Sequence, residues 1–123
     1  MSDQPTRHFT ELVVWQKAHQ FVLEINKATK SFPKDELYGL TSQIRRAAVS
    51  VPANIAEGYR RRGTQDKARF LNTAQSSLDE CRYLLMLGSD LEYLEASDAR
   101  FKQADEVARI LYAYENSVRR AAK

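Results

Sequence analysis

The chain has few of the residues that interrupt helices or cross-link chains. Its 123 residues include four Gly, three Pro and one Cys. A single Cys cannot form a disulfide within the chain, which is typical of proteins from a reducing compartment. Because Gly and Pro are scarce, long segments run without interruption, and this favours helices within one domain.

Long apolar runs and targeting signals are also missing. No apolar run reaches the roughly 18 residues of a membrane-spanning helix, and residues 1–8, MSDQPTRH, lack the apolar stretch of a secretory signal. The letters KDEL stand at residues 34–37, inside the chain, where they cannot act as a C-terminal retention signal. We therefore expect a cytoplasmic protein without membrane contact. We expect residues 1–8 to form a disordered tail.

The signatures of common catalytic sites are absent as well. No Glu has a His three residues later, and no Gly-rich phosphate loop, nucleophile elbow or zinc-ligand spacing occurs. His19 lies at the edge of an apolar stripe, which favours a structural or surface role. Cys81 lies within another stripe, where a thiol behaves as a small apolar group. We expect no enzyme activity, no metal and no cofactor.

Apolar residues recur at alternating spacings of three and four in several long segments. The stripe of residues 10–31 extends to Phe32 and consists of Trp15, Ala18, Val22, Ile25, Thr29 and Phe32. That of residues 64–87 extends to Gly88 and consists of Leu71, Ala74, Leu78, Cys81, Leu85 and Gly88. The last segment carries Phe101, Ala104, Ala108, Leu111, Tyr114 and Val118. Together with residues 41–62, these three segments predict an all-α, antiparallel up-down-up-down four-helix bundle over residues 9–123. We expect Thr41, Thr64 and Ser97 to cap the N-termini of the second, third and fourth helices.

Residues 41–62, TSQIRRAAVSVPANIAEGYRRR, are apolar on two sides. One side consists of Ile44, Ala47, Val51, Ile55 and Gly58, which predicts a core face. The opposite side carries a strip of small apolar residues, which predicts an oligomer interface at Val49, Ala53 and Ala56. Pro52 predicts a bend that frees the carbonyl of Ala48. Asn54 either has a structural role, satisfying the backbone groups that Pro52 releases or fixing the helix register, or is an ordinary surface residue.

The same segment resembles a known family. Residues 43–58, QIRRAAVSVPANIAEG, resemble the signature of the four-helix-bundle proteins encoded by intervening sequences of bacterial 23S rRNA, and residues 11–18, ELVVWQKA, are similar to the start of that family's first helix. The resemblance implies an antiparallel bundle that assembles into a homopentamer. It also implies kinship with the accessory variability determinant of diversity-generating retroelements, a basic pentamer that binds nucleic acid and a reverse transcriptase. Most members have no assigned activity.

Basic residues concentrate in the first half of the chain. Residues 1–62 hold 10 Lys and Arg against 6 Asp and Glu, a net charge of +4, whereas residues 63–123 hold 9 against 10, a net charge of −1. The arginines of the second helix form two groups about 22 Å apart. Because guanidinium groups bind phosphates, we predict a nucleic-acid-binding surface at Arg45, Arg46, Arg60, Arg61 and Arg62. We expect Tyr59, beside the second group, to stack on a base. The alternative is a solvated charge cluster at a helix C-terminus, with Glu57 and Arg61 as an i,i+4 pair.

Two functions remain open on these observations. The favoured one is a non-catalytic, homo-oligomeric binding module, pentameric by resemblance, whose partner is RNA or DNA. The alternative is a protein-interaction or scaffold subunit, in which the arginines form salt bridges between protomers and the ligand is another protein. An enzyme is the least favoured reading.

Overall fold

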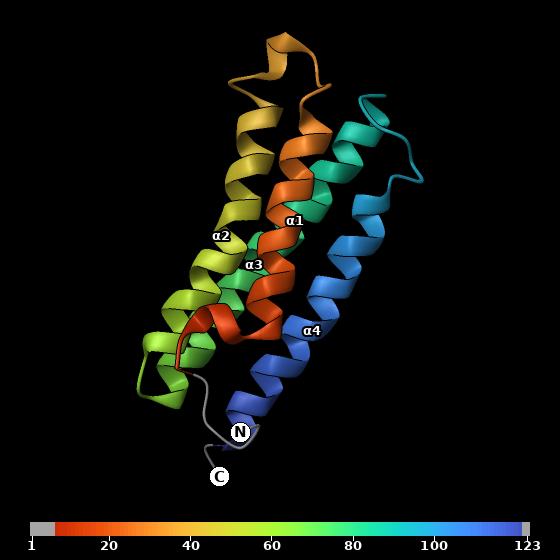
Figure 1. The fold of residues 1–123 in the computed structure, drawn as a ribbon. Coiled ribbons are helices and arrows are strands. Elements are labelled where there is room, and N and C mark those ends of the chain that lie inside the picture. The colour runs from red at the N-terminus through yellow and green to blue at the C-terminus, as the bar shows by residue number, and fades with distance from the viewer. Residues whose placement is uncertain (1–6, 122–123) are drawn as a thin grey trace.

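The computed structural model describes residues 7–121, and over these residues the chain forms four α-helices and two short 3-10 helices, with no strand. The α-helices are α1 (Val13–Thr29), α2 (Leu40–Arg60), α3 (Thr64–Asp90) and α4 (Ala99–Ala121). The 3-10 helices η1 (Phe9–Glu11) and η2 (Lys34–Glu36) precede α1 and α2. Consecutive helices run in opposite directions side by side (Figure 1). The prediction of an all-α, up-down-up-down bundle is confirmed.

The four helices enclose one apolar core. Each helix packs against two others, because α1 contacts α2 and α4, and α3 contacts α2 and α4. The largest fully buried side chains come from all four helices and include Phe21, Ile25, Ile44, Ile55, Leu71, Leu78, Leu85 and Leu111. The predicted stripes of α1, α2 and α3 are buried except for Trp15, which is half-buried. On α4 only Ala104 and Leu111 of the predicted stripe are buried, while Val107 and Glu115 are buried and were not predicted. The other predicted residues are half-buried: Phe101, Ala108, Tyr114 and Val118.

Helix α1 begins at Val13, three residues later than predicted, because the extended backbone of Leu12 separates it from η1. The starts of the other three helices differ from the prediction by one or two residues. Thr41 does not cap α2: the helix begins at Leu40, Thr41 is buried, and the carboxylate of Glu36 accepts the Leu40 N–H at 3.1 Å. Thr64 is the first residue of α3, after Gly63, which makes no side-chain cap. A negative carboxylate is favoured over a hydroxyl at the positive end of a helix, which explains the first difference.

The start of α4 shows the same preference for a carboxylate. Asp98, rather than the predicted Ser97, accepts the backbone N–H of Arg100 at 2.9 Å. At the amino end of the described chain, the Arg7 N–H donates to the side chain of Glu11 at 3.0 Å, and the His8 ring accepts the Thr10 N–H at 3.4 Å. Residues 1–6 of the predicted tail lie outside the described residues, and their disorder stays a prediction.

The helix ends carry two further differences. Arg61 has an extended backbone with ψ of 145°, so Arg61 and Arg62 follow α2 and do not belong to it. Helix α3 continues past Gly88. Gly88 is buried against the Phe32 ring, which would lie 3.3 Å from a Cβ added at this position. The end of α3 is a left-handed turn, in which Glu92 has φ of 65° and the Tyr93 N–H donates to the carbonyl of Gly88 at 2.8 Å.

Pro52 lies inside α2 and is buried, and the helix continues on both sides of it. The side-chain amide of Asn54 donates to the carbonyl of Ser50 at 2.8 Å and to its hydroxyl at 3.0 Å. The Ser50 hydroxyl in turn forms a 2.7 Å hydrogen bond with Ser77 of α3. Asn54 therefore has a structural role, as one of the two readings predicted, but its partner is Ser50 and not the carbonyl of Ala48. The three side chains join α2 to α3 through polar contacts.

Candidate nucleic-acid interface

The five predicted arginines occupy different environments, and the first of them has partners inside the bundle. Arg45 is half-buried and turns toward the end of α1. Its Nε donates to the Thr29 hydroxyl at 2.8 Å, and its terminal nitrogen lies 3.5 Å from the carbonyl of Asn26. A cation is favoured there, because the last carbonyls of a helix carry partial negative charge. Arg46, one residue later, is exposed.

Arg61 is also engaged within the bundle. Its guanidinium forms a 2.8 Å ion pair with Glu57, which confirms the predicted i,i+4 pair. The same group lies 4.6 Å above the centre of the Phe70 ring, and Arg69 lies 4.8 Å from that centre. Its charge is thus balanced by a carboxylate and an aromatic face. Arg60 and Arg62 on either side are exposed and form no ion pair with any residue between 7 and 121.

Helices α3 and α4 add further cations at this end of the bundle. We call it the basic end, defined by Arg60, Arg62, Lys67, Arg69 and Arg120. The α2–α3 turn and the C-terminal end of α4 both lie there (Figure 1). Arg120 is exposed, whereas its neighbour Arg119 pairs with Glu115 at 2.6 Å. Sequence reasoning missed Lys67 and Arg69, although both lie close to Arg62 in the sequence. It also missed Arg120, which only the antiparallel packing of α4 brings to this end.

The side chain of Lys67 caps the C-terminal end of α2. Its ammonium donates to the carbonyl of Tyr59 at 2.8 Å and to that of Gly58 at 3.3 Å, which are two of the last carbonyls of the helix. Desolvation lowers the pKa of Lys67. The same ammonium lies 5.5 Å from the centre of the Tyr59 ring. Tyr59, predicted to stack on a base, is half-buried and already has a cation against its ring.

Glu115 is a buried acid that sequence reasoning missed. Its carboxylate accepts hydrogen bonds from Arg119 on its own helix and from the amide of Gln75 on α3. The other acids of the basic end also have partners: Glu57 pairs with Arg61, and Asp66 pairs with Arg69 at 3.1 Å. The acids here are therefore engaged, while Arg60, Arg62 and Arg120 are left without an ion pair within the described chain.

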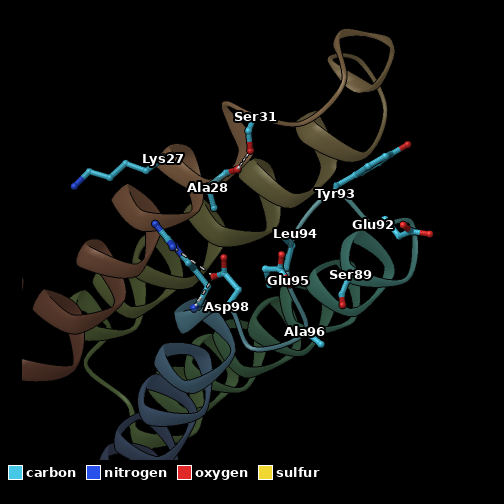
Figure 2. A pocket seen from close by; sticks show the side chains of 11 residues that line it. Lys27, Ala28, Ser31, Ser89, Glu92, Tyr93, Leu94, Glu95, Ala96 and Asp98 are labelled. Carbon is cyan, nitrogen blue, oxygen red and sulfur yellow. Dashed lines mark hydrogen bonds and ion pairs between the residues drawn. The ribbon is translucent and has the colours of Figure 1, made fainter.

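The opposite end of the bundle carries several acids around a surface hollow. A hollow of about 650 Å³ lies between α1 and the connector that follows α3, with Glu92, Glu95 and Asp98 among its lining residues (Figure 2). The two cations that line this hollow are both paired with acids. Arg100 pairs with Glu24 at 2.9 Å and with Asp98 at 3.4 Å, and Lys27 lies 3.6 Å from Glu24. The carboxylates that line this hollow disfavour an anionic ligand there.

The small apolar strip of α2 lies at the surface of the single chain. Val49 is 50% exposed, Ala53 is exposed and Ala56 is half-buried. Arg46 and Arg60, which bracket the strip, are exposed as well. The strip is thus accessible to a second protein surface.

Cys81 is fully buried, and its sulfur lies 3.9 Å from the carbonyl of Ile44. Burial, with a smaller contribution from Glu80, raises the pKa of this thiol from 9.0 to about 12.

We expect a disulfide reagent at about pH 8 to leave the thiol of Cys81 unmodified in the folded protein and to label one thiol per chain after unfolding. Because the folded pKa lies above the unfolded one, the associated stabilisation is complete below about pH 9 and is lost as the pH rises toward 12. Rapid labelling of the native protein would contradict this burial.

Residues 7–121 contain no group of three or more His, Cys, Asp or Glu side chains arranged to hold a metal ion. No helix in this range is long and apolar enough to cross a membrane. The expected absence of a metal, a cofactor and enzyme activity stays a prediction.

Comparisons with known proteins support the fold. A model of the 23S rRNA-intervening sequence protein family matches residues 10–113. A crystal structure of a protein with unknown function from the S23 ribosomal protein family of Bacteroides thetaiotaomicron superposes with a TM-score of 0.76. The match covers 84% of this chain and 98% of that chain at 24% sequence identity, so the likeness concerns the fold alone. No curated protein matches the chain.

Proposed function

Since the chain belongs to the 23S rRNA-intervening sequence protein family, we propose that it is a non-catalytic, homo-oligomeric module that binds nucleic acid at the basic end of its bundle. The observation that carries the proposal is the state of Arg60 and Arg62. Both are exposed and without an ion pair within residues 7–121, while the neighbouring Glu57, Asp66 and Glu115 are held by other cations.

Phosphate groups are the part of a nucleic acid that such a surface recognises. Guanidinium groups bind phosphate oxygens and release condensed counterions, which supplies affinity but little sequence specificity. Arg46 lies on the same outer side of α2 as Arg60 and extends the positive surface along the helix. In an oligomer, each protomer contributes its own copy of this surface, so several weak contacts act together on one nucleic acid.

Replacing Arg60 and Arg62 with Gln should weaken the binding of a labelled RNA, because two phosphate contacts are lost in each engaged protomer. The slope of log K against log salt should become shallower by about 0.7 for each lost contact on single strands and about 0.9 on duplex. Fluorescence anisotropy from about 50 mM salt upward measures both quantities. Lys30→Gln with Lys34→Gln is the matched control, because it removes two exposed cations at the opposite end of the bundle.

The control pair should leave the affinity and the slope nearly unchanged. An equal loss in both double variants would show that only net charge matters, and the basic end would no longer be the site. A parent protein that binds no RNA or DNA at about 50 mM salt, where such contacts are strongest, would remove the nucleic-acid proposal.

The proposed oligomer uses the apolar strip of Val49, Ala53 and Ala56. Ala53→Asp should dissociate it, because the contact would bury an unpaired charge. Ala113→Asp on α4 is the matched control, since Ala113 is also exposed on a helix surface. Light scattering should find a smaller particle for the first variant alone, with the helical circular dichroism kept in both. A monomeric parent protein would contradict the interface and the pentamer that the family resemblance implies.

A protein-interaction or scaffold subunit is the second candidate. It is favoured by an exposed apolar group around Arg46, where Tyr38 is 93% exposed and Leu37 and Val49 lie nearby in a shallow hollow. Tyr and Arg are among the residue types enriched in the residues that carry most of the binding energy at protein–protein interfaces. If Arg60→Gln with Arg62→Gln broke the oligomer, those arginines would belong to an interface between protomers, and this second candidate would be preferred.

A further inference from the structure

Four aromatic rings form a continuous row along η1 and the first turns of α1. We call them the aromatic row: His8, Phe9, Trp15 and His19. The His8 and Phe9 rings stack at 4.3 Å, and the Trp15 and His19 rings stack nearly parallel, 10° apart in orientation and 5.0 Å between centres. The two pairs meet edge to face, with Phe9 5.2 Å from Trp15.

The outer rings of the row are accessible. His8 and His19 are exposed, whereas Phe9 and Trp15, on which they stack, are half-buried. The row belongs to η1 and the first turns of α1, and η1 also contacts α2. In Figure 1, η1 crosses the part of α2 that leads to the α2–α3 turn, so the row begins close to the basic end.

The two imidazoles are held in place before any ligand arrives. The His8 ring nitrogen is 2.8 Å from the Thr10 hydroxyl, and each histidine has one ring face covered by its aromatic neighbour. A flat group that adds to the free face of either ring therefore restricts few additional rotamers. Flat, unpaired rings carried on a chain of phosphates are the bases of a single-stranded nucleic acid.

We propose that the ligand of the basic end is single-stranded nucleic acid, whose bases stack on His8 and His19 while Arg60 and Arg62 bind its phosphates. The inference rests on the proposed function and specifies its ligand class. Bases within a duplex are already paired and stacked on each other, so they cannot reach these rings. Stacking on aromatic side chains tolerates any base, in agreement with phosphate contacts that carry no sequence information.

The test compares three probes of equal length: a single-stranded 20-mer of mixed sequence, its duplex, and an abasic 20-mer with the same number of phosphates. The single strand should bind the parent protein most tightly, and the abasic strand should keep only the phosphate contribution. The chain contains only two histidines, so nuclear magnetic resonance can follow both imidazoles individually. Their ring protons should shift upfield with the single strand, owing to the ring current of the stacked base, and not with the abasic strand.

Variants separate the rings from the charges. His8→Ala with His19→Ala should weaken binding of the single strand at least about fivefold for each lost stack, and should leave binding of the abasic strand unchanged. His8→Phe with His19→Phe keeps an aromatic face at both positions and should restore the single-strand affinity. Arg60→Gln with Arg62→Gln should weaken both strands together. Circular dichroism confirms that each variant is folded.

Three outcomes would overturn the inference. Equal binding of the single strand, the duplex and the abasic strand would leave phosphate recognition at the basic end and remove the stacking site. A smaller oligomer after His8→Ala with His19→Ala would assign the aromatic row to a contact between protomers. Failure of all three probes to bind would remove the proposed function itself, and the stacking inference with it.

Discussion

Leu78→Ala and Leu111→Ala should each lower the free energy of unfolding by about 2–5 kcal/mol, because each removes a buried side chain and leaves a cavity. Leu78 on α3 is 1% exposed and Leu111 on α4 is 0% exposed. Urea denaturation followed by circular dichroism measures the loss. Since an oligomer gains stability with concentration, the parent and the variants must be compared at one protomer concentration.

Leu23→Ala on α1 is the matched control. Leu23 is 50% exposed, so the same truncation should cost about 1 kcal/mol or less. If both core variants lost less than about 0.5 kcal/mol, the typical effect of a surface substitution, the packing of α3 and α4 described above would be wrong.

The second large effect is expected at Gly58, where α2 and α3 approach closely. A Cβ at this position would lie 3.3 Å from the carbonyl oxygen of Lys67 and 3.3 Å from the Cβ of Phe70. The first of these atoms belongs to the backbone and cannot rotate away. Gly58→Leu should therefore destabilise the protein by about 1–3 kcal/mol through overpacking, and should loosen the α2–α3 turn that positions Arg60 and Arg62.

Gly63→Ala tests whether this cost comes from crowding rather than from the loss of a glycine. No atom lies within 4 Å of the Cβ that it would add, and its φ of −81° suits any residue. Its free energy of unfolding should stay within about 0.5 kcal/mol of the parent, as for other surface substitutions. Urea denaturation of both variants decides the point, and equal losses would contradict the close approach at Gly58.

The sequence by itself determined the number, type and approximate limits of the helices. The alternating spacing in α1, α2 and α3 predicts which side of each helix is buried, because helical periodicity is a local property of the chain. The resemblance of residues 43–58 to the 23S rRNA-intervening sequence proteins is confirmed by a family match over residues 10–113. The predicted pair of Glu57 and Arg61 is also confirmed, since it spans one helical turn.

Only the tertiary structure decided which of the arginines are available to a ligand. Arg45 binds the end of α1 and Arg61 stacks on Phe70 of α3, whereas Arg60 and Arg62 stay exposed. The burial of Glu115, the cations gathered at the basic end and the aromatic row likewise depend on residues that are distant in the sequence or separated by a break in the helix. A spacing pattern records one helix at a time, while these features arise where helices and turns meet.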